Sequence, residues 1–151
     1  MKRMILLLLA LGAATALAVS TSGVATADEI PLKVTLTNGS CTQQSNGTLL
    51  CQGSLTGLGG QSISVTVTSG FGCMNQGGNQ PPGQVSGTQN NIQVRNGNAT
   101  FGVTTSSASC PDHMTPIFTG TAQCPGQAQV DVTQFFSGGR TKATTFCIPI
   151  T

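Results

Sequence analysis

Six cysteines are the residues of this sequence best suited to chemistry, and their even number favours disulfide bonds. They are Cys41, Cys51, Cys73, Cys110, Cys124 and Cys147. An even count is typical of a disulfide framework in an oxidising compartment, so we expect three disulfides. Zinc binding is the alternative, but the sequence has no Cys-x-x-Cys pair and His113 is its only histidine. We therefore expect no metal and no other cofactor.

Residues that could combine as acid, base and nucleophile are scarce. Hydrolysis by paired carboxylates needs two acids at a fixed separation. Apart from Asp28 and Glu29, which lie at the expected new N-terminus, only Asp112 and Asp131 remain for such a pair. A Ser-His-Asp arrangement would have to use His113, and the sequence has no Gly-x-Ser-x-Gly turn. We predict that the chain has no catalytic residues and is not an enzyme.

The first 27 residues have the three parts of a secretory signal peptide. Lys2 and Arg3 form a basic start, residues 5–19 form an apolar block, and Ala25 and Ala27 satisfy the small-residue rule for cleavage. We predict that residues 1–27 are a signal peptide and that residues 28–151 form one secreted domain. An uncleaved N-terminal anchor is the alternative.

The charges of residues 28–151 balance, with four Lys or Arg side chains against four Asp or Glu side chains. A chain without excess positive charge cannot neutralise phosphates over a patch of its surface. We therefore expect neither a nucleic acid partner nor stable membrane insertion after cleavage. The remaining partners are an extracellular protein or a small molecule.

Apolar residues alternate with polar ones in several short segments, which is the pattern of half-buried β-strands. Gly and Asn separate these segments, and no stretch has the period of a helix. We predict an all-β protein, built as a single antiparallel β-sandwich of immunoglobulin-like type and stabilised by disulfides. The alternating residues are Leu32, Val34 and Leu36; Ile63, Val65 and Val67; Ala99, Phe101 and Val103; and Ala128, Val130 and Val132.

Asn96–Gly97 has the composition of a two-residue hairpin turn. A turn of that length sets Val94 opposite Ala99 and Ile92 opposite Phe101, so that the apolar residues share a face. A three-residue loop would pair apolar with polar residues instead. We expect a β-hairpin around this turn.

The segment from Cys41 to Cys51 requires the other loop length. A three-residue loop at Ser45–Gly47, with Gly47 in the left-handed conformation, puts Cys41 directly across from Cys51. We predict a cross-strand disulfide between them. The four other cysteines allow three connectivities, and their spacing does not choose among them. Asn38–Gly39 predicts a further turn before this hairpin.

The loop "CMNQGGNQPPGQ", residues 73–84, is the best candidate for recognition. Asn75, Gln76, Asn79 and Gln80 offer neutral donors and acceptors on a backbone that glycines loosen and prolines stiffen. The loop suits binding to a partner, and it equally suits a crossover between strands with a disulfide at one end.

Four segments carry a resemblance to a group of small secreted actinobacterial proteins. They read "CQGSLTGLGG", "CMNQGGNQPPGQ", "VRNGNATFGVTT" and "CPDHMTP", in that order along the middle of the chain. The sequence departs from the group at Met74 and Gln76, where Thr and Pro are usual, and at Met114, near a usual Trp. No biochemical activity is established for the group, so the resemblance implies secretion and a β-domain without catalytic residues.

The hairpin with nine residues between its cysteines also resembles one in the neocarzinostatin-type apoproteins. Those proteins are immunoglobulin-like sandwiches that hold an apolar chromophore, so this likeness implies a similar fold. We predict a non-catalytic secreted protein that acts as an extracellular binding or interaction module. The alternatives are a secreted inhibitor of hydrolases and a carrier of an apolar small molecule.

Overall fold

The computed structural model describes residues 33–74, 83–111 and 114–151. The expected signal peptide 1–27, the loop residues Asn75, Gln76, Asn79 and Gln80, and the Asp112–His113 pair lie outside the described residues. The described elements are β1 (Thr35–Gln43), β2 (Leu49–Thr56), β3 (Ser62–Met74), β4 (Gly83–Gln93), β5 (Ala99–Thr104), β6 (Thr115–Gly120), β7 (Gln127–Phe135), the short 3-10 helix η1 (Ser137–Gly139) and β8 (Thr141–Pro149).

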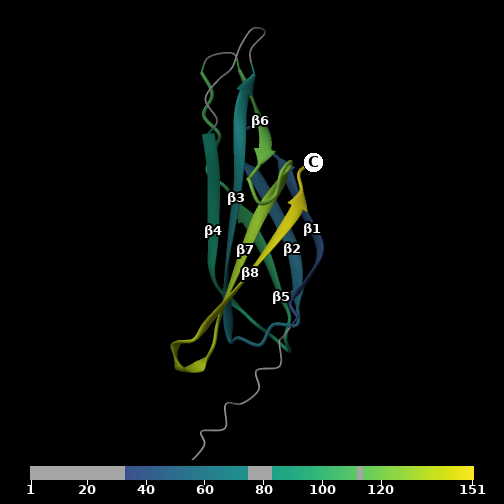
Figure 1. Cartoon of the computed structure of the whole chain (residues 1–151), viewed down its shortest axis with the longest axis vertical. Coiled ribbons are helices and arrows are strands. Elements are labelled where there is room, and N and C mark those ends of the chain that lie inside the picture. Colours follow the sequence, from purple (N-terminus) through teal and green to yellow (C-terminus); the bar gives the residue numbers. More distant parts are fainter. Residues whose placement is uncertain (1–32, 75–82, 112–113) are drawn as a thin grey trace, which may run out of the picture.

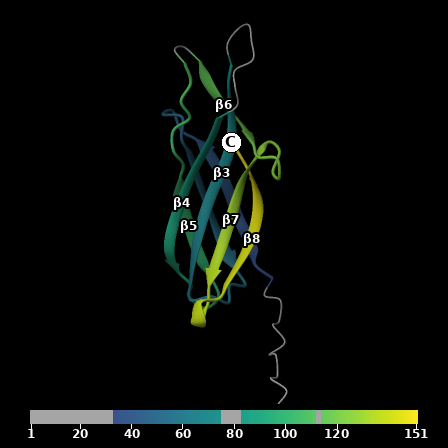
Figure 2. The same ribbon diagram turned by 60° about the vertical axis from the view of Figure 1, so that its left-hand side comes forward.

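Two antiparallel sheets face each other. One has the strand order β1-β2-β5, and the other has the order β4-β3-β7-β8, with β6 paired to the C-terminal end of β3. Figures 1 and 2 show β3, β7 and β8 in one layer and β1, β2 and β5 in the layer behind it. The predicted all-β sandwich is confirmed. The immunoglobulin-like subtype stays a prediction.

The core lies between the sheets and is filled by every second residue of the strands. Val65 of β3 pairs with Val132 of β7, and both are fully buried. Phe101 of β5 packs into the same cluster from the facing sheet. Period-two alternation therefore marked the inward positions correctly, because successive strand residues point to opposite faces. Of the residues expected to alternate, Leu32 lies outside the described ranges and Leu36 is only partly buried.

The hairpin between β1 and β2 has the predicted geometry. Gln44 and Thr48 are joined by a main-chain hydrogen bond of 2.8 Å across a three-residue loop, and Gly47 has a φ of 78°. Cys41 lies directly opposite Cys51, and their sulfur atoms form a disulfide. The prediction of a Cys41–Cys51 disulfide is confirmed.

The prediction of a turn at Asn38–Gly39 is wrong, because β1 continues through both residues as a bulged strand. The register with β2 shifts between Thr37 and Ser40, and Asn38 takes the left-handed conformation with a φ of 54°. Asparagine tolerates this conformation better than most residues, so the Asn-Gly pair suits a bulge as well as a turn. The strand bends there and continues into the Cys41 hairpin.

The turn at Asn96–Gly97 is confirmed, but the hairpin expected around it is not. Arg95 and Asn98 form the single bridge between the two flanking segments. Ile92 pairs with Ile63 of β3, while β5 pairs with β2 in the other sheet. The expected pairings of Val94 with Ala99 and of Ile92 with Phe101 are therefore wrong. All four side chains still pack on one core, which is why the apolar pattern resembled that of a hairpin.

Both open sides of the sandwich are held by a few bonds between the sheets. On one side, Thr151 exchanges main-chain hydrogen bonds with the end of β1, donating to Cys41 and accepting from Gln43. On the other side, the Gln89 Oε1 atom of β4 accepts a bond of 3.0 Å from the Gly102 amide of β5. These bonds satisfy main-chain groups at edges that would otherwise be free to pair with other chains.

Candidate functional site

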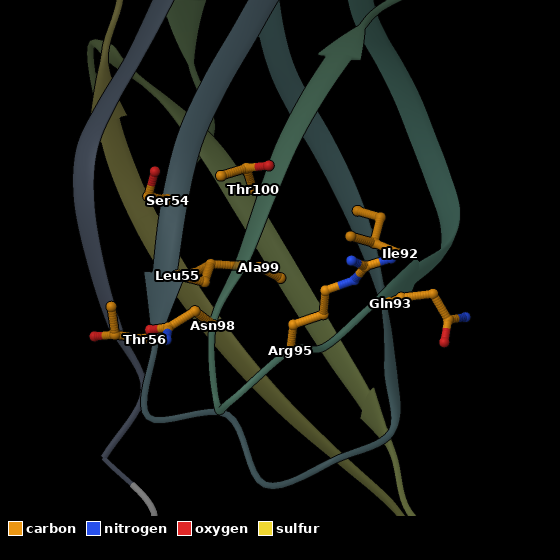
Figure 3. Close-up of a pocket in the computed structure, with 9 residues that line it drawn as sticks. All are labelled: Ser54, Leu55, Thr56, Ile92, Gln93, Arg95, Asn98, Ala99 and Thr100. Atoms are coloured by element: carbon orange, nitrogen blue, oxygen red, sulfur yellow. The ribbon is translucent and has the colours of Figure 1, made fainter.

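An open groove of about 490 Å³ crosses β5 near the Asn96–Gly97 turn. Strand β5 runs through the middle of it, with residues of β2 on one side and residues from the end of β4 on the other (Figure 3). Nine residues line the groove: Ser54, Leu55, Thr56, Ile92, Gln93, Arg95, Asn98, Ala99 and Thr100.

The fold places polar and apolar groups in alternation along the groove. Leu55 and Ala99 are paired across β2 and β5 and are buried in the core. Their chain neighbours Ser54 and Thr100 form the next pair and lie on the outer face. Outward residues can therefore vary in chemistry while the inward ones keep the two sheets packed.

Arg95 is the one charged residue among the nine that line the groove. It lies two residues after the end of β4 at Gln93, and its main chain is fixed by two hydrogen bonds of 2.9 Å with Asn98. Figure 3 shows its side chain on the same side of β5 as Ile92 and Gln93. Within the described part of the chain, the guanidinium has no hydrogen-bond or ion-pair partner, and none of the nine lining residues is acidic.

Three hydroxyl groups of the groove are also without partners. The side chains of Ser54, Thr56 and Thr100 make no hydrogen bond to any other described residue. The Asn98 amide is partly engaged, because its Nδ2 atom donates to the Asn96 carbonyl oxygen at 2.9 Å. The groove thus offers one cation and several free hydroxyls beside a small apolar area. This arrangement can bind a ligand, but it contains no base to activate a nucleophile.

Asp131 does not join this site. It is the one acidic side chain that the structure describes, and it lies on β7 in the other sheet. Its carboxylate accepts hydrogen bonds from Gln129 Nε2 at 2.9 Å and from Thr145 Oγ1 at 2.6 Å. Asp131 therefore ties neighbouring side chains together across the outer face of β7 and β8.

The remaining cysteines are all accounted for by disulfides. Cys73 is joined to Cys110, and Cys124 is joined to Cys147. These bonds select one of the three connectivities that the spacing left open. No group of His, Cys, Asp or Glu side chains in the described ranges could hold a metal ion.

A second exposed feature lies at the β3–β6 end of the sandwich. Met74 is 64% exposed and Ile117 is 41% exposed. Ile117 pairs with Gly72, two residues before Met74, so both side chains lie on the same outer face. The Cys73–Cys110 disulfide holds this end from the inner face. The start of the predicted recognition loop is therefore anchored, while Asn75, Gln76, Asn79 and Gln80 themselves are not described.

Sequence reasoning missed the groove because its lining comes from three separate strands. Serine and threonine on outward strand positions are ordinary, so they gave no signal. Arg95 gave a weak signal, because it is one of only four basic residues after residue 27 and it lies next to a turn.

Comparison of the chain with models of known families, with curated proteins and with solved structures finds no match.

Proposed function

We propose that this chain is an exported, non-catalytic module that binds a small ligand in the groove across β5. The observation that carries the proposal is the groove itself, which is lined by Arg95, by three hydroxyls without partners among the described residues, and by the apolar Ile92. Binding sites in proteins typically combine an apolar area with a few polar groups that fix orientation. The proposed ligand would meet both kinds of surface.

Export is supported by the sequence and by the disulfides together. The basic and apolar start of the chain has the form of a signal peptide, and all six cysteines are in disulfides. Disulfides persist in extracellular compartments and are rare in the reducing cytosol. Within residues 33–74, 83–111 and 114–151, no helix has the length and apolar character needed to cross a membrane.

The experiment is a fragment screen by NMR on the ¹⁵N-labelled protein spanning residues 28–151. Ligands of the groove should shift the amide signals of its lining residues as a group. The variant Thr100→Trp should abolish these shifts, because a large ring would fill the groove. Thr104→Trp is the matched control, since Thr104 is an exposed residue of the same strand and face outside the groove. Shifts that gather elsewhere, or that survive Thr100→Trp, would contradict the proposal.

A second candidate, inhibition of a secreted hydrolase, is favoured by the exposed Met74 and Ile117. Apolar side chains that are exposed together on one face can form a contact point for another protein. The test is the residual activity of a panel of secreted proteases and glycosidases in the presence of the chain. Inhibition should be lost on changing both residues to Ser. Inhibition should survive Phe135→Ser, because Phe135 is as exposed as Ile117, at 41%, but pairs with the other end of β3.

A further inference from the structure

We infer that the groove selects a small organic carboxylate, that is, a molecule with one carboxylate group and a short apolar body. The inference rests on the proposed function, because it names the ligand class of the same groove. It is drawn from the charge of the lining, the hydrogen-bonding groups left free there, and the position of the apolar side chain that a ligand can reach.

The charge of the groove favours an anion. Arg95 is its one charged residue, and the described acid Asp131 is engaged on the other sheet. A guanidinium is a permanent cation whose planar set of donors matches the two oxygens of a carboxylate. A single cation suits a ligand with one negative charge better than a phosphate, which carries more.

The main chain that carries the guanidinium is fixed by a tight turn. Asn96 and Gly97 both have positive φ values, 51° and 74°, and Arg95 is bonded to Asn98 across them. This is the geometry of a tight two-residue turn, which leaves the main chain little freedom. A side chain that starts from a fixed main chain loses less freedom when it binds a ligand.

The apolar body has a defined place to lie. Leu55 and Ala99 are buried, whereas Ile92 is only partly buried and remains within reach of a ligand on the side of β5 where Arg95 lies (Figure 3). A short alkyl or aryl group attached to the carboxylate would cover Ile92. The hydroxyl of Thr100, on β5 between the two sides of the groove, makes no hydrogen bond to another described residue and is free to donate to a ligand. A ligand with both parts gains from both surfaces.

The test compares hexanoate with two probes that each lack one part. Hexanamide has nearly the same shape without the charge, and acetate has the charge without the apolar body. Binding is followed by the amide shifts of Arg95, Asn98 and Thr100 in the ¹⁵N-labelled protein at low chloride. We expect hexanoate to bind roughly tenfold more tightly than hexanamide, as a charge-assisted hydrogen bond implies, and more tightly than acetate.

Two variants assign the effect to Arg95. The change Arg95→Gln should remove the preference for hexanoate over hexanamide. The change Lys142→Gln, which removes an exposed cation outside the groove, should leave it intact. Equal binding of hexanoate and hexanamide would overturn the inference of a carboxylate ligand, but it would still agree with the proposal that the groove binds a small ligand. If acetate binds as tightly as hexanoate, the inference that the ligand needs an apolar body is overturned. If none of the three binds, the inference fails, and the fragment screen with Thr100→Trp decides the proposed function separately.

Discussion

Arg95 and Asn98 exchange two main-chain hydrogen bonds of 2.9 Å each, although the strands on either side of them belong to different sheets. This pair is the one bridge between the end of β4 and the start of β5. Both residues also line the groove. The turn that joins the two sheets therefore also positions the groove's single cation.

Replacing Gly97 by Ala should destabilise this turn. Gly97 has a φ of 74°, a conformation that a side chain makes costly, while the nearest atom to an added Cβ is the Leu58 carbonyl oxygen at an ordinary 3.4 Å. We expect a loss of about 1–2 kcal/mol in the free energy of unfolding, measured in urea. Gly102→Ala is the control, because that glycine has no positive φ and no neighbour nearer than 3.8 Å. Equal stability of the two variants would contradict the left-handed turn.

Replacing Gly87 by Ala should disturb the side of the sandwich where β4 meets β5. An added Cβ there would collide with the main-chain carbonyl of Thr104 and lie 2.9 Å from the Thr105 Cα atom. We expect a loss of about 1–3 kcal/mol, because the main chain of one sheet must move. Thermal unfolding measures this loss, and Gly72→Ala is the control that should have little effect, since nothing lies within 4 Å of its added Cβ.

The Cys73–Cys110 and Cys41–Cys51 disulfides should contribute unequally to stability. Cys73 and Cys110 are separated by 37 residues, whereas Cys41 and Cys51 are separated by 10. In the chain-entropy model, changing the distant pair to Ala should cost about 4 kcal/mol and changing the hairpin pair about 3 kcal/mol. Equilibrium unfolding of the two double variants measures the difference. A larger loss for the hairpin pair would show that its packing in the core outweighs the loop closure.

Changing Gln134 to Leu should stabilise the protein. Gln134 is fully buried, and its Nε2 atom has no hydrogen-bond partner in the described structure. Its Oε1 atom accepts a bond of 2.9 Å from the Gly59 amide, but Gly59 is exposed, so water can replace that acceptor. We expect a gain of about 1 kcal/mol, seen as a higher melting temperature. A loss of stability would mean that the bond to Gly59 outweighs the unpaired amide.

Material collected outside an expressing bacterial cell should begin at Asp28. The small residues Ala25 and Ala27 satisfy the cleavage rule, and the apolar block ends several residues before them. N-terminal sequencing of the exported protein measures this directly. A secreted product that begins at Met1 would exclude this cleavage, and protein retained in the membrane with Met1 intact would favour the N-terminal anchor.

Local patterns in the sequence predicted the parts of the fold that depend on local geometry. The alternation at Ile63, Val65 and Val67 identified a strand and its inward face, because the side-chain period of a strand is two. A three-residue loop with Gly47 in the left-handed conformation placed Cys41 across from Cys51, because each loop length permits one register. Both results follow from residues close together in the chain.

The errors and omissions involve contacts between distant segments. The sequence around Asn96–Gly97 is compatible with a hairpin and with a change of sheet, and only pairing of Ile92 with Ile63 distinguishes them. The groove depends on that same change of sheet, because β4 pairs with β3 instead of β5, and its end residues Ile92 and Gln93 line a separate side of the groove. No local pattern encodes which sheet a strand joins, so neither result could be predicted from the sequence.

Strand β3 pairs on both sides along its first part, with β4 on one side and β7 on the other. Val65 and Val67 lie in this doubly paired stretch and are fully buried. Their amide protons can meet solvent deuterium only when neighbouring strands separate on a large scale. The slowest exchange rates in the molecule should therefore occur here and should report the opening of the entire sandwich, while strands paired on one side exchange through smaller local fluctuations.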